Sequence, residues 1–244
     1  MTRVKICGCM SVSDALAAKD AGADFVGLMF APDSRRRLSV EEGRAIVASL
    51  TGRTPEPPLM SLGADGTTAS WFWHGADALD RLLARRRPLT VGVFEDQTLA
   101  EVNTIADAVG LDLIQLSGSE TWADCLLANR QVVKAVEIPD GASGGDVLGK
   151  IEGGTAIACL LDGSRGQGVA IDTAVAADIA QDLPVWLAGG LSPENVSEIV
   201  EQARPWAVDV SSGVETDGAK DAEKIRAFVL AAKEAGATAG GRSK

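Results

Sequence analysis

Small residues end two apolar segments in the C-terminal half of the chain. Residues 185–188 run into Gly189-Gly190, and residues 207–210 run into Ser211-Ser212-Gly213. The Ser-Pro-Glu run at 192–194 has the cap, first-turn proline and acid that are typical of a helix start. Free backbone N–H groups beside a helix start bind phosphate. Two such turns on neighbouring parallel strands predict a cup for one phosphate group, although Gly-Gly alone would equally serve the tight packing of a helix.

Cys7 and Asp162 also stand at the ends of apolar segments, residues 3–7 and 156–161. A thiol with a pKa of about 8.5 is a weak base at neutral pH unless a cation or a helix dipole favours the thiolate. Side chains alternate along a strand, so Lys5 shares a face with Cys7 and could supply that cation. The alternative for Cys7 is a structural role as a small buried side chain.

Segments rich in Val, Ile and Leu alternate with helical segments along most of the chain. Strands are expected at 3–7, 24–30, 89–94, 112–116, 132–137, 156–161, 185–188 and 207–210. Helices are expected at 11–21, 40–50, 99–109, 120–129, 145–151, 171–181, from 192 onward and at 219–235. This alternation requires a parallel sheet, and eight such units within about 250 residues predict a single α/β fold, a (β/α)8 TIM barrel over residues 1–235. Barrels of this kind place their catalytic groups at the C-terminal ends of the strands.

Residues 51–88 interrupt the alternation between the second helix and the third strand. Prolines and glycines within 55–66 are typical of a loop, and Trp71-Phe72-Trp73 precedes a short helical segment at 76–87. The chain order places this insertion on the face opposite the active site, where we expect its aromatic residues to fold back on the barrel floor. A docking surface for another domain or subunit is the alternative. Residues 236–244 are polar and glycine-rich, and a disordered tail is expected there.

The composition limits the partners and the compartment. The 244 residues carry a net charge of −11, which disfavours nucleic acid and anionic membranes as partners. The sequence contains neither an apolar run of membrane-spanning length nor a signal-peptide segment. Four cysteines without framework spacing indicate a reducing compartment, and we expect the cytoplasm. Because His74 is the single histidine, the Cys7-Gly8-Cys9 run is not expected to bind a metal.

A series of short motifs resembles phosphoribosylanthranilate isomerase, in order along residues 2–233 with the insertion left out. The motifs are VKICG at 4–8, FAPDSRR at 30–36, VGVF at 91–94, QLSG at 115–118, LLD at 160–162, LAGGL at 187–191 and DVSSGVE at 209–215. Residues 210–216, with Asp217-Gly218 and residues 221–228 behind them, most resemble the isomerase domains of eukaryotic multifunctional tryptophan-pathway enzymes.

The resemblance implies a cofactor-free Amadori rearrangement in tryptophan biosynthesis, from N-(5-phosphoribosyl)anthranilate to the 1-deoxyribulose phosphate isomer. It implies that Cys7 is the base that removes the C2′ proton and that Asp162 is the acid that opens the furanose ring. Arg36 would contact the anthranilate carboxylate, and Ser117 and Asp209 would lie beside the substrate.

The same resemblance assigns the phosphate group to the two turns described above and to Gly166 and Gly168 in a third turn after the sixth strand. It implies a phosphorylated small molecule as the partner. It also implies, as in some members of the family, fusion to or association with other enzymes of the tryptophan pathway.

Two positions depart from the family pattern. The family usually has Gln-Leu-His-Gly where this chain has Ser117, and serine is shorter and cannot titrate near neutrality. The loop after the sixth strand has Arg-Gly-Gln-Gly at 165–168 in place of Gly-Gly-Thr-Gly.

Two alternatives stay open. One is a related ribose-phosphate isomerase of histidine biosynthesis, but that family has an aspartate where the first strand here ends in Cys7. The other is a degenerate, non-catalytic phosphate-binding barrel or scaffold. Ser117 favours this reading, whereas the combination of Cys7, Arg36 and Asp162 argues against it.

Overall fold

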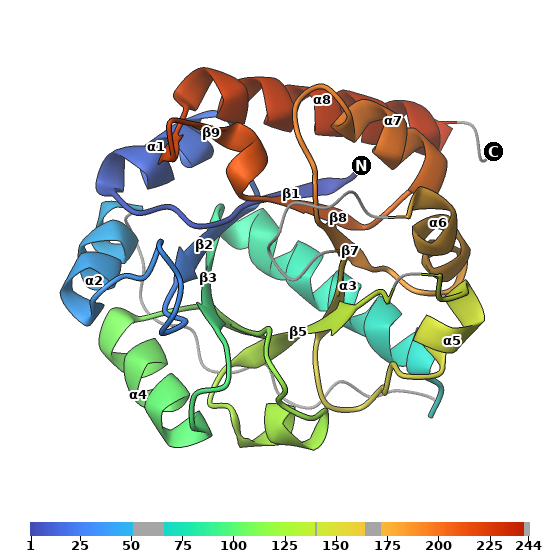
Figure 1. Ribbon diagram of the computed structural model, residues 1–244, viewed down its shortest axis with the longest axis horizontal. Helices are drawn as coiled ribbons and strands as arrows, with labels where there is room; N and C mark the ends of the chain where they lie inside the picture. Colours follow the sequence, from blue (N-terminus) through green and yellow to red (C-terminus); the bar gives the residue numbers. More distant parts are fainter. Residues whose placement is uncertain (51–65, 140, 164–171, 242–244) are drawn as a thin grey trace.

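The computed structural model describes residues 1–50, 66–139, 141–163 and 172–241. Eight parallel strands close into a barrel in chain order, as the alternation predicts, and helices surround them (Figure 1). The strands are β1 Arg3–Ile6, β2 Phe25–Met29, β3 Leu89–Phe94, β4 Leu113–Leu116, β5 Gln131–Glu137, β6 Ala158–Asp162, β7 Trp186–Ala188 and β8 Ala207–Val210. The outer helices are α1 Val12–Asp20, α2 Val40–Ser49, α4 Leu99–Val109, α5 Gly144–Leu148, α6 Thr173–Asp182, α7 Val196–Ala203 and α8 Ala222–Gly241.

Serine side chains begin three of the outer helices. Ser11, Ser39 and Ser143 each accept a hydrogen bond from the backbone of the third helical residue, whose acidic side chain accepts one from the cap backbone. These capping boxes satisfy N–H groups that have no partner within the helix. They fix where α1, α2 and α5 begin.

The helix expected at 120–129 is only a short 3-10 helix, η1 Ala123–Leu127. Its start lacks a side-chain cap. The backbone and hydroxyl of Thr121 instead donate to the Asp124 carboxylate, 2.7 Å away in both cases. Such local side-chain hydrogen bonds compete with helical hydrogen bonding, so the helix is shorter than the apolar pattern predicted.

Alternation along the strands produces two apolar clusters. Outward-facing side chains pack against the helices and form the larger cluster. Inward-facing side chains, including Phe25, Leu113 and Trp186, fill the barrel interior. The inner cluster also contains Leu79 and Leu83 of α3 Thr68–Arg85, so one helix closes the interior from one end.

That helix is the described part of the 51–88 insertion, and it crosses the ring of strands instead of joining the outer ring of helices (Figure 1). Its contacts are with the N-terminal ends of strands and the turns before them. Arg3 at the start of β1 donates to Asp80 at 2.8 Å, and the indole of Trp71 donates to the carbonyl of Ala156, just before β6. Phe72 is buried. Helix α3 therefore forms the floor of the barrel, while residues 51–65 lie outside the described residues.

The first and last strands are joined by a buried ion pair. Strands β1 and β8 pair with Lys5 directly opposite Asp209, and the Lys5 Nζ to Asp209 Oδ2 distance is 2.7 Å. The Lys5 side chain is fully buried and that of Asp209 is 6% exposed. Lys5 therefore faces the barrel interior, and the Asp209 carboxylate supplies the partner that a buried lysine requires.

The C-terminal helix is longer than expected. Helix α8 continues to Gly241, beyond residue 235 where the sequence pattern placed its end; residues 242–244 lie outside the described part. A Cβ at Gly236 would lie 2.5 Å from the Thr2 backbone nitrogen, so close packing against the N-terminus carries the helix past this glycine. None of the helices within the described residues is long and apolar enough to cross a membrane.

The Lys5–Asp209 pair should dominate the response of stability to mutation inside the barrel. We expect Lys5→Met to lower the free energy of unfolding by about 3–5 kcal/mol, because it leaves a buried carboxylate without its cation. Adding Asp209→Leu to Lys5→Met should restore most of that loss, since no charge is then buried. Urea unfolding of the single and double variants measures both values. Additive losses would contradict the pairing.

Candidate active site

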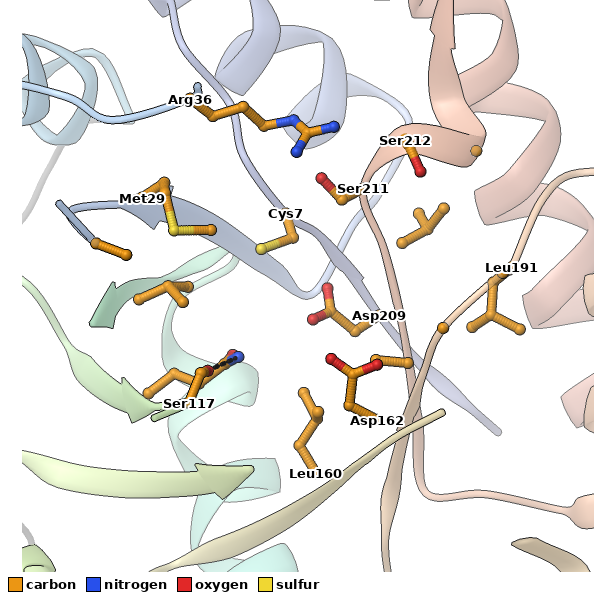
Figure 2. A pocket seen from close by; sticks show the side chains of 18 of the residues that line it. Cys7, Met29, Arg36, Ser117, Leu160, Asp162, Leu191, Asp209, Ser211 and Ser212 are labelled. Carbon is orange, nitrogen blue, oxygen red and sulfur yellow. Dashed lines mark hydrogen bonds between the residues drawn. The ribbon is translucent and has the colours of Figure 1, made fainter. Parts of the chain in front are cut away.

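One pocket opens at the C-terminal ends of the strands, on the side of the barrel away from α3. Side chains from several strands and their following loops reach into it (Figure 2). Of the residues predicted for the site, those that line it are Cys7, Arg36, Ser117, Asp162, Gly189, Gly190, Asp209, Ser211, Ser212 and Gly213. The structure thus brings together side chains that are more than 200 positions apart in the sequence. Gly166 and Gly168 lie outside the described residues.

Cys7 lies at the end of β1 with its thiol directed into the pocket (Figure 2). Burial raises the pKa of the Cys7 thiol above its ordinary value, and the neighbouring Lys5 ammonium opposes that shift. Burial also tends to lower the pKa of Lys5, but the Asp209 carboxylate outweighs it and raises the pKa, so Lys5 stays charged. A permanent cation therefore lies beside the candidate base.

Two aspartates stand on neighbouring parts of the pocket wall. Asp162 ends β6 and Asp209 lies in β8, with Asp209 between Cys7 and Asp162 in the view of Figure 2. Oδ2 of Asp209 accepts from Lys5, whereas Oδ1 is buried and has no hydrogen-bond partner among the described atoms. A buried oxygen without a partner costs free energy, so Oδ1 is suited to accept a hydrogen bond from a bound molecule.

The two small-residue turns lie against each other at one side of the pocket. A Cβ at Gly213 would lie 1.9 Å from the carbonyl oxygen of Leu191, so only glycine permits this approach. Gly189 and Gly190 have φ values of 105° and 63°, which L-residues with a side chain avoid. The backbone N–H groups of Gly190, Ser212 and Gly213 donate to no described residue. This geometry supports an anion cup.

The helix after the first turn begins later than the sequence indicates. Helix α7 starts at Val196. Ser192 still makes the contacts expected of a cap, because its hydroxyl accepts from the Glu194 backbone at 3.3 Å and its carbonyl accepts from the Val196 backbone at 3.1 Å. The Asn195 side chain also holds the turn together: its Oδ1 accepts from the Ser192 backbone at 2.8 Å, and its Nδ2 donates to the Gly190 carbonyl at 2.9 Å. Residues 192–195 therefore form a separate turn between the glycines and the helix.

Ser117 is already hydrogen-bonded within the site. The Gln115 amide donates to the Ser117 hydroxyl at 3.0 Å, and the two side chains lie on the same pocket wall (Figure 2). The hydroxyl proton of Ser117 remains available to a ligand, because the amide occupies only an acceptor position. Gln115 was not predicted as a site residue, although its position two residues before Ser117 on a strand indicates the same face.

Arg36 reaches the pocket from the loop after β2 and pairs with Glu215, beyond the second small-residue turn. Its Nε and Nη2 donate to the two carboxylate oxygens of Glu215 at 2.7 and 3.0 Å. Arg35 and Lys220 also pair with Glu215, and Glu215 and Lys220 were missed as functional residues. Only the position of Glu215 within the last motif pointed to it.

Comparisons with known proteins agree with this geometry. The family model described as N-(5′-phosphoribosyl)anthranilate (PRA) isomerase matches residues 66–231. An N-(5′-phosphoribosyl)anthranilate isomerase of Roseiflexus sp. (strain RS-1) is 42% identical, with 96% of this chain and 99% of that protein covered. A multifunctional tryptophan biosynthesis protein of Phycomyces blakesleeanus is 40% identical over 95% of this chain, which spans only 32% of that longer protein.

A solved structure has the same fold. A phosphoribosyl anthranilate isomerase in complex with reduced 1-(o-carboxyphenylamino)-1-deoxyribulose 5-phosphate superimposes with a TM-score of 0.72 at 30% identity. The match covers 96% of this chain and all of that one.

The contact between the two turns should be essential for anion binding. We expect Gly213→Ala to weaken the binding of inorganic phosphate by about tenfold or more, because the added methyl would push the turns apart and misalign N–H donors worth about 1.5–3 kcal/mol each. Calorimetry with inorganic phosphate measures the change. Gly110→Ala is the control, since it adds a methyl group at the end of α4 where a Cβ would meet no atom closer than 4.0 Å. Gly110 has a positive φ, so this control also tests whether backbone strain alone lowers the affinity. Equal phosphate affinity in both variants would place the anion elsewhere.

Proposed function

The chain belongs to the N-(5′-phosphoribosyl)anthranilate isomerase family, and we propose that Cys7 and Asp162 carry out the isomerisation in its pocket. The reaction converts N-(5′-phosphoribosyl)anthranilate to 1-(2-carboxyphenylamino)-1-deoxyribulose 5-phosphate in tryptophan biosynthesis. One observation carries the assignment: a thiol and a carboxyl group reach into the same pocket, which also holds an anion cup and an arginine (Figure 2).

The proposed steps need no external oxidant or reductant, because C1′ is reduced as C2′ is oxidised. Asp162 donates a proton to the furanose ring oxygen as its bond to C1′ breaks, which leaves an iminium between C1′ and the anthranilate nitrogen. Cys7, as the thiolate, then removes the proton from C2′, and the electron pair moves to form the enolamine. Transfer of the O2′ proton to C1′ yields the ketone; Cys7 then loses its proton to solvent and Asp162 takes one up, which restores both groups. A general acid at the ring oxygen and a general base at C2′, on the two sides of C1′, are sufficient for this chemistry.

The remaining residues are proposed to bind the substrate. The N–H groups of the two turns would hold the phosphate, and the free Nη1 of Arg36 would face the anthranilate carboxylate. The unpartnered Oδ1 of Asp209 would accept from a ribose hydroxyl or from the anthranilate N–H. Ser117 would donate its hydroxyl proton to the substrate while Gln115 fixes its orientation.

The alternative of a degenerate, non-catalytic barrel has no support from the comparisons, since relatives named as isomerases match over their full length. Fusion to or association with other enzymes of the tryptophan pathway is a proposal for this chain, supported by the multifunctional relative. We also propose that the protein works in a reducing compartment such as the cytoplasm. Its four cysteines are buried free thiols, which supports this proposal.

Substitution of either proposed catalytic group should nearly abolish turnover. Cys7→Ser replaces the thiolate with a hydroxyl that stays protonated, and Asp162→Asn removes the donated proton; each should lower kcat by about 10²–10⁴-fold or more. The double variant should be little worse than either single one, because the two steps act on one substrate in series. An assay of the purified protein with N-(5′-phosphoribosyl)anthranilate measures this. Full activity in Cys7→Ser would remove the base from the mechanism.

The rate should also depend on the ionisation of Cys7. Only the thiolate accepts the C2′ proton, and burial raises the thiol pKa above its ordinary value of about 8.5. We therefore expect kcat/KM to rise with pH and to level off only above about pH 8.5. Thiolate absorbance at 240 nm, with Cys7→Ser as the blank, should titrate over the same range. A rate that is flat between pH 7 and 9.5 would exclude Cys7 as a base of raised pKa.

A further inference from the structure

Arg36, Glu215 and Lys220 form a cluster at the mouth of the pocket, which we call the Arg36 clamp. Arg36 and Glu215 make the two-point contact described above, and Lys220 Nζ lies 2.9 Å from Glu215 Oε1. The side chains are 14%, 6% and 2% exposed, respectively. Two-point contacts between guanidinium and carboxylate fix the plane of both groups, so Arg36 is held in one orientation.

Lys220 also binds the turn that forms one half of the anion cup. Its ammonium donates to the Ser211 carbonyl at 2.9 Å and lies 3.5 Å from the Ser211 hydroxyl. One buried lysine thus contacts both the partner of Arg36 and the backbone of the phosphate turn. The two ends of the pocket are connected through side chains that do not line it.

Glu215 and Lys220 lie in a separate two-stranded hairpin. Among the described strands, β9 Glu215–Thr216 and β10 Ala219–Lys220 pair only with each other, with Glu215 directly opposite Lys220. A sheet of two such short strands is marginal by itself, so contacts of its side chains must stabilise it. Glu215 stays ionised throughout the physiological range: burial opposes ionisation, but Arg36 and Lys220 lower its pKa to about 2.

The Arg36 side chain also packs on Gly8 at the end of the first strand. The Arg36 side chain crosses Gly8, the neighbour of Cys7, so closely that a Cβ there would lie 2.5 Å from Arg36 Cδ. After its two bonds to Glu215, Arg36 keeps Nη1, which makes no hydrogen bond with a described residue. The guanidinium is therefore held over Gly8, near the Ser211 turn, with one nitrogen that donates to no described residue.

We propose that Glu215 and Lys220 are positioning residues that set the spacing between the carboxylate-binding and phosphate-binding ends of the pocket. Glu215 orients Arg36, which binds the aromatic carboxylate. Lys220 positions both ends of the pocket, because it contacts Glu215 and also the Ser211 turn that binds the phosphate. This inference rests on the proposed function for the identity of the two anionic groups. It makes the clamp a determinant of specificity for a ligand with both groups.

The test compares two unreactive ligands, so it does not depend on turnover. One is reduced 1-(o-carboxyphenylamino)-1-deoxyribulose 5-phosphate, and the other is its phenylamino counterpart without the carboxylate. Calorimetry gives the Kd of each for the wild-type chain and for Glu215→Gln and Lys220→Met. The control is Glu223→Gln, which removes an exposed ion pair with Arg226 on the next helix.

We expect the wild-type chain to bind the carboxylate-bearing ligand at least about tenfold more tightly, as charge-assisted hydrogen bonds predict. Glu215→Gln should remove most of that preference and leave the affinity for the phenylamino ligand within about twofold. Lys220→Met should weaken the binding of both ligands. Glu223→Gln should change neither affinity, because exposed ion pairs contribute little to stability.

Three outcomes would overturn the proposal. An equal loss of affinity for both ligands in Glu215→Gln would indicate a merely structural role. Tighter binding of the carboxylate-bearing ligand by this variant would show that Glu215 competes with the ligand carboxylate for Arg36. Equal affinity of the wild-type chain for the two ligands would show that the pocket has no subsite for the carboxylate. Turnover of the wild-type chain, measured separately, decides the proposed function, so its failure is distinguishable from that of the clamp.

The orientation of Arg36 has its own readout. The Nε–H proton of Arg36, assigned by NMR with Arg36→Lys, should exchange slowly with solvent in the wild-type chain, because it is bonded to Glu215 at 2.7 Å. In Glu215→Gln this protection should be lost. Unchanged protection would show that the clamp does not hold the guanidinium.

Discussion

The Lys5–Asp209 ion pair lies where the first strand of the barrel meets the last. Closure of the barrel places these two residues opposite each other, and the closure in turn buries both charges. Neither charge is tolerable in the interior without the other. The pair also lies beneath Cys7, so a single interaction contributes to closure and places a cation beside the proposed base. Because one oxygen of Asp209 is still unpartnered, the structural pair keeps a polar group available to a ligand.

The two ends of the barrel are built for different tasks. Helix α3 fills the N-terminal end with apolar side chains, and two polar contacts, Arg3 with Asp80 and Trp71 with the Ala156 carbonyl, attach the helix to the barrel. The C-terminal end keeps a pocket lined by glycine turns and ionisable side chains. Stability and chemistry are therefore separated along the barrel axis, which permits variation in the floor without disturbing the site. This separation explains how a long insertion fits into a chain of otherwise short connections.

A chain with a net charge of −11 must concentrate positive potential to bind an anionic substrate. It does so with few groups. Arg35, Arg36 and Lys220 surround the single carboxylate of Glu215, so the cluster has an excess of positive charge at the pocket mouth. The N–H groups of the glycine and serine turns add partial positive charge at the other end without any side-chain charge. Burial of Glu215 and Lys220 keeps solvent screening at this cluster low.

The sequence alone determined the barrel, because local patterns predict its strands and helices, and motifs that resemble a known family indicated the main residues of the pocket. Alternation of apolar strands and helices predicted the closed sheet, and the position of Cys7 and Asp162 at strand ends predicted their common pocket. Patterns failed where a distant contact decides the outcome. Packing against Thr2 accompanies the extension of α8 past its glycines. The roles of Glu215 and Lys220 emerged only from the tertiary structure, since Arg36 is 179 residues from Glu215 in the sequence and meets it only when the barrel closes. Local sequence sets each element, but hydrogen bonds between the loops that follow different strands arise only from the closed arrangement of those strands.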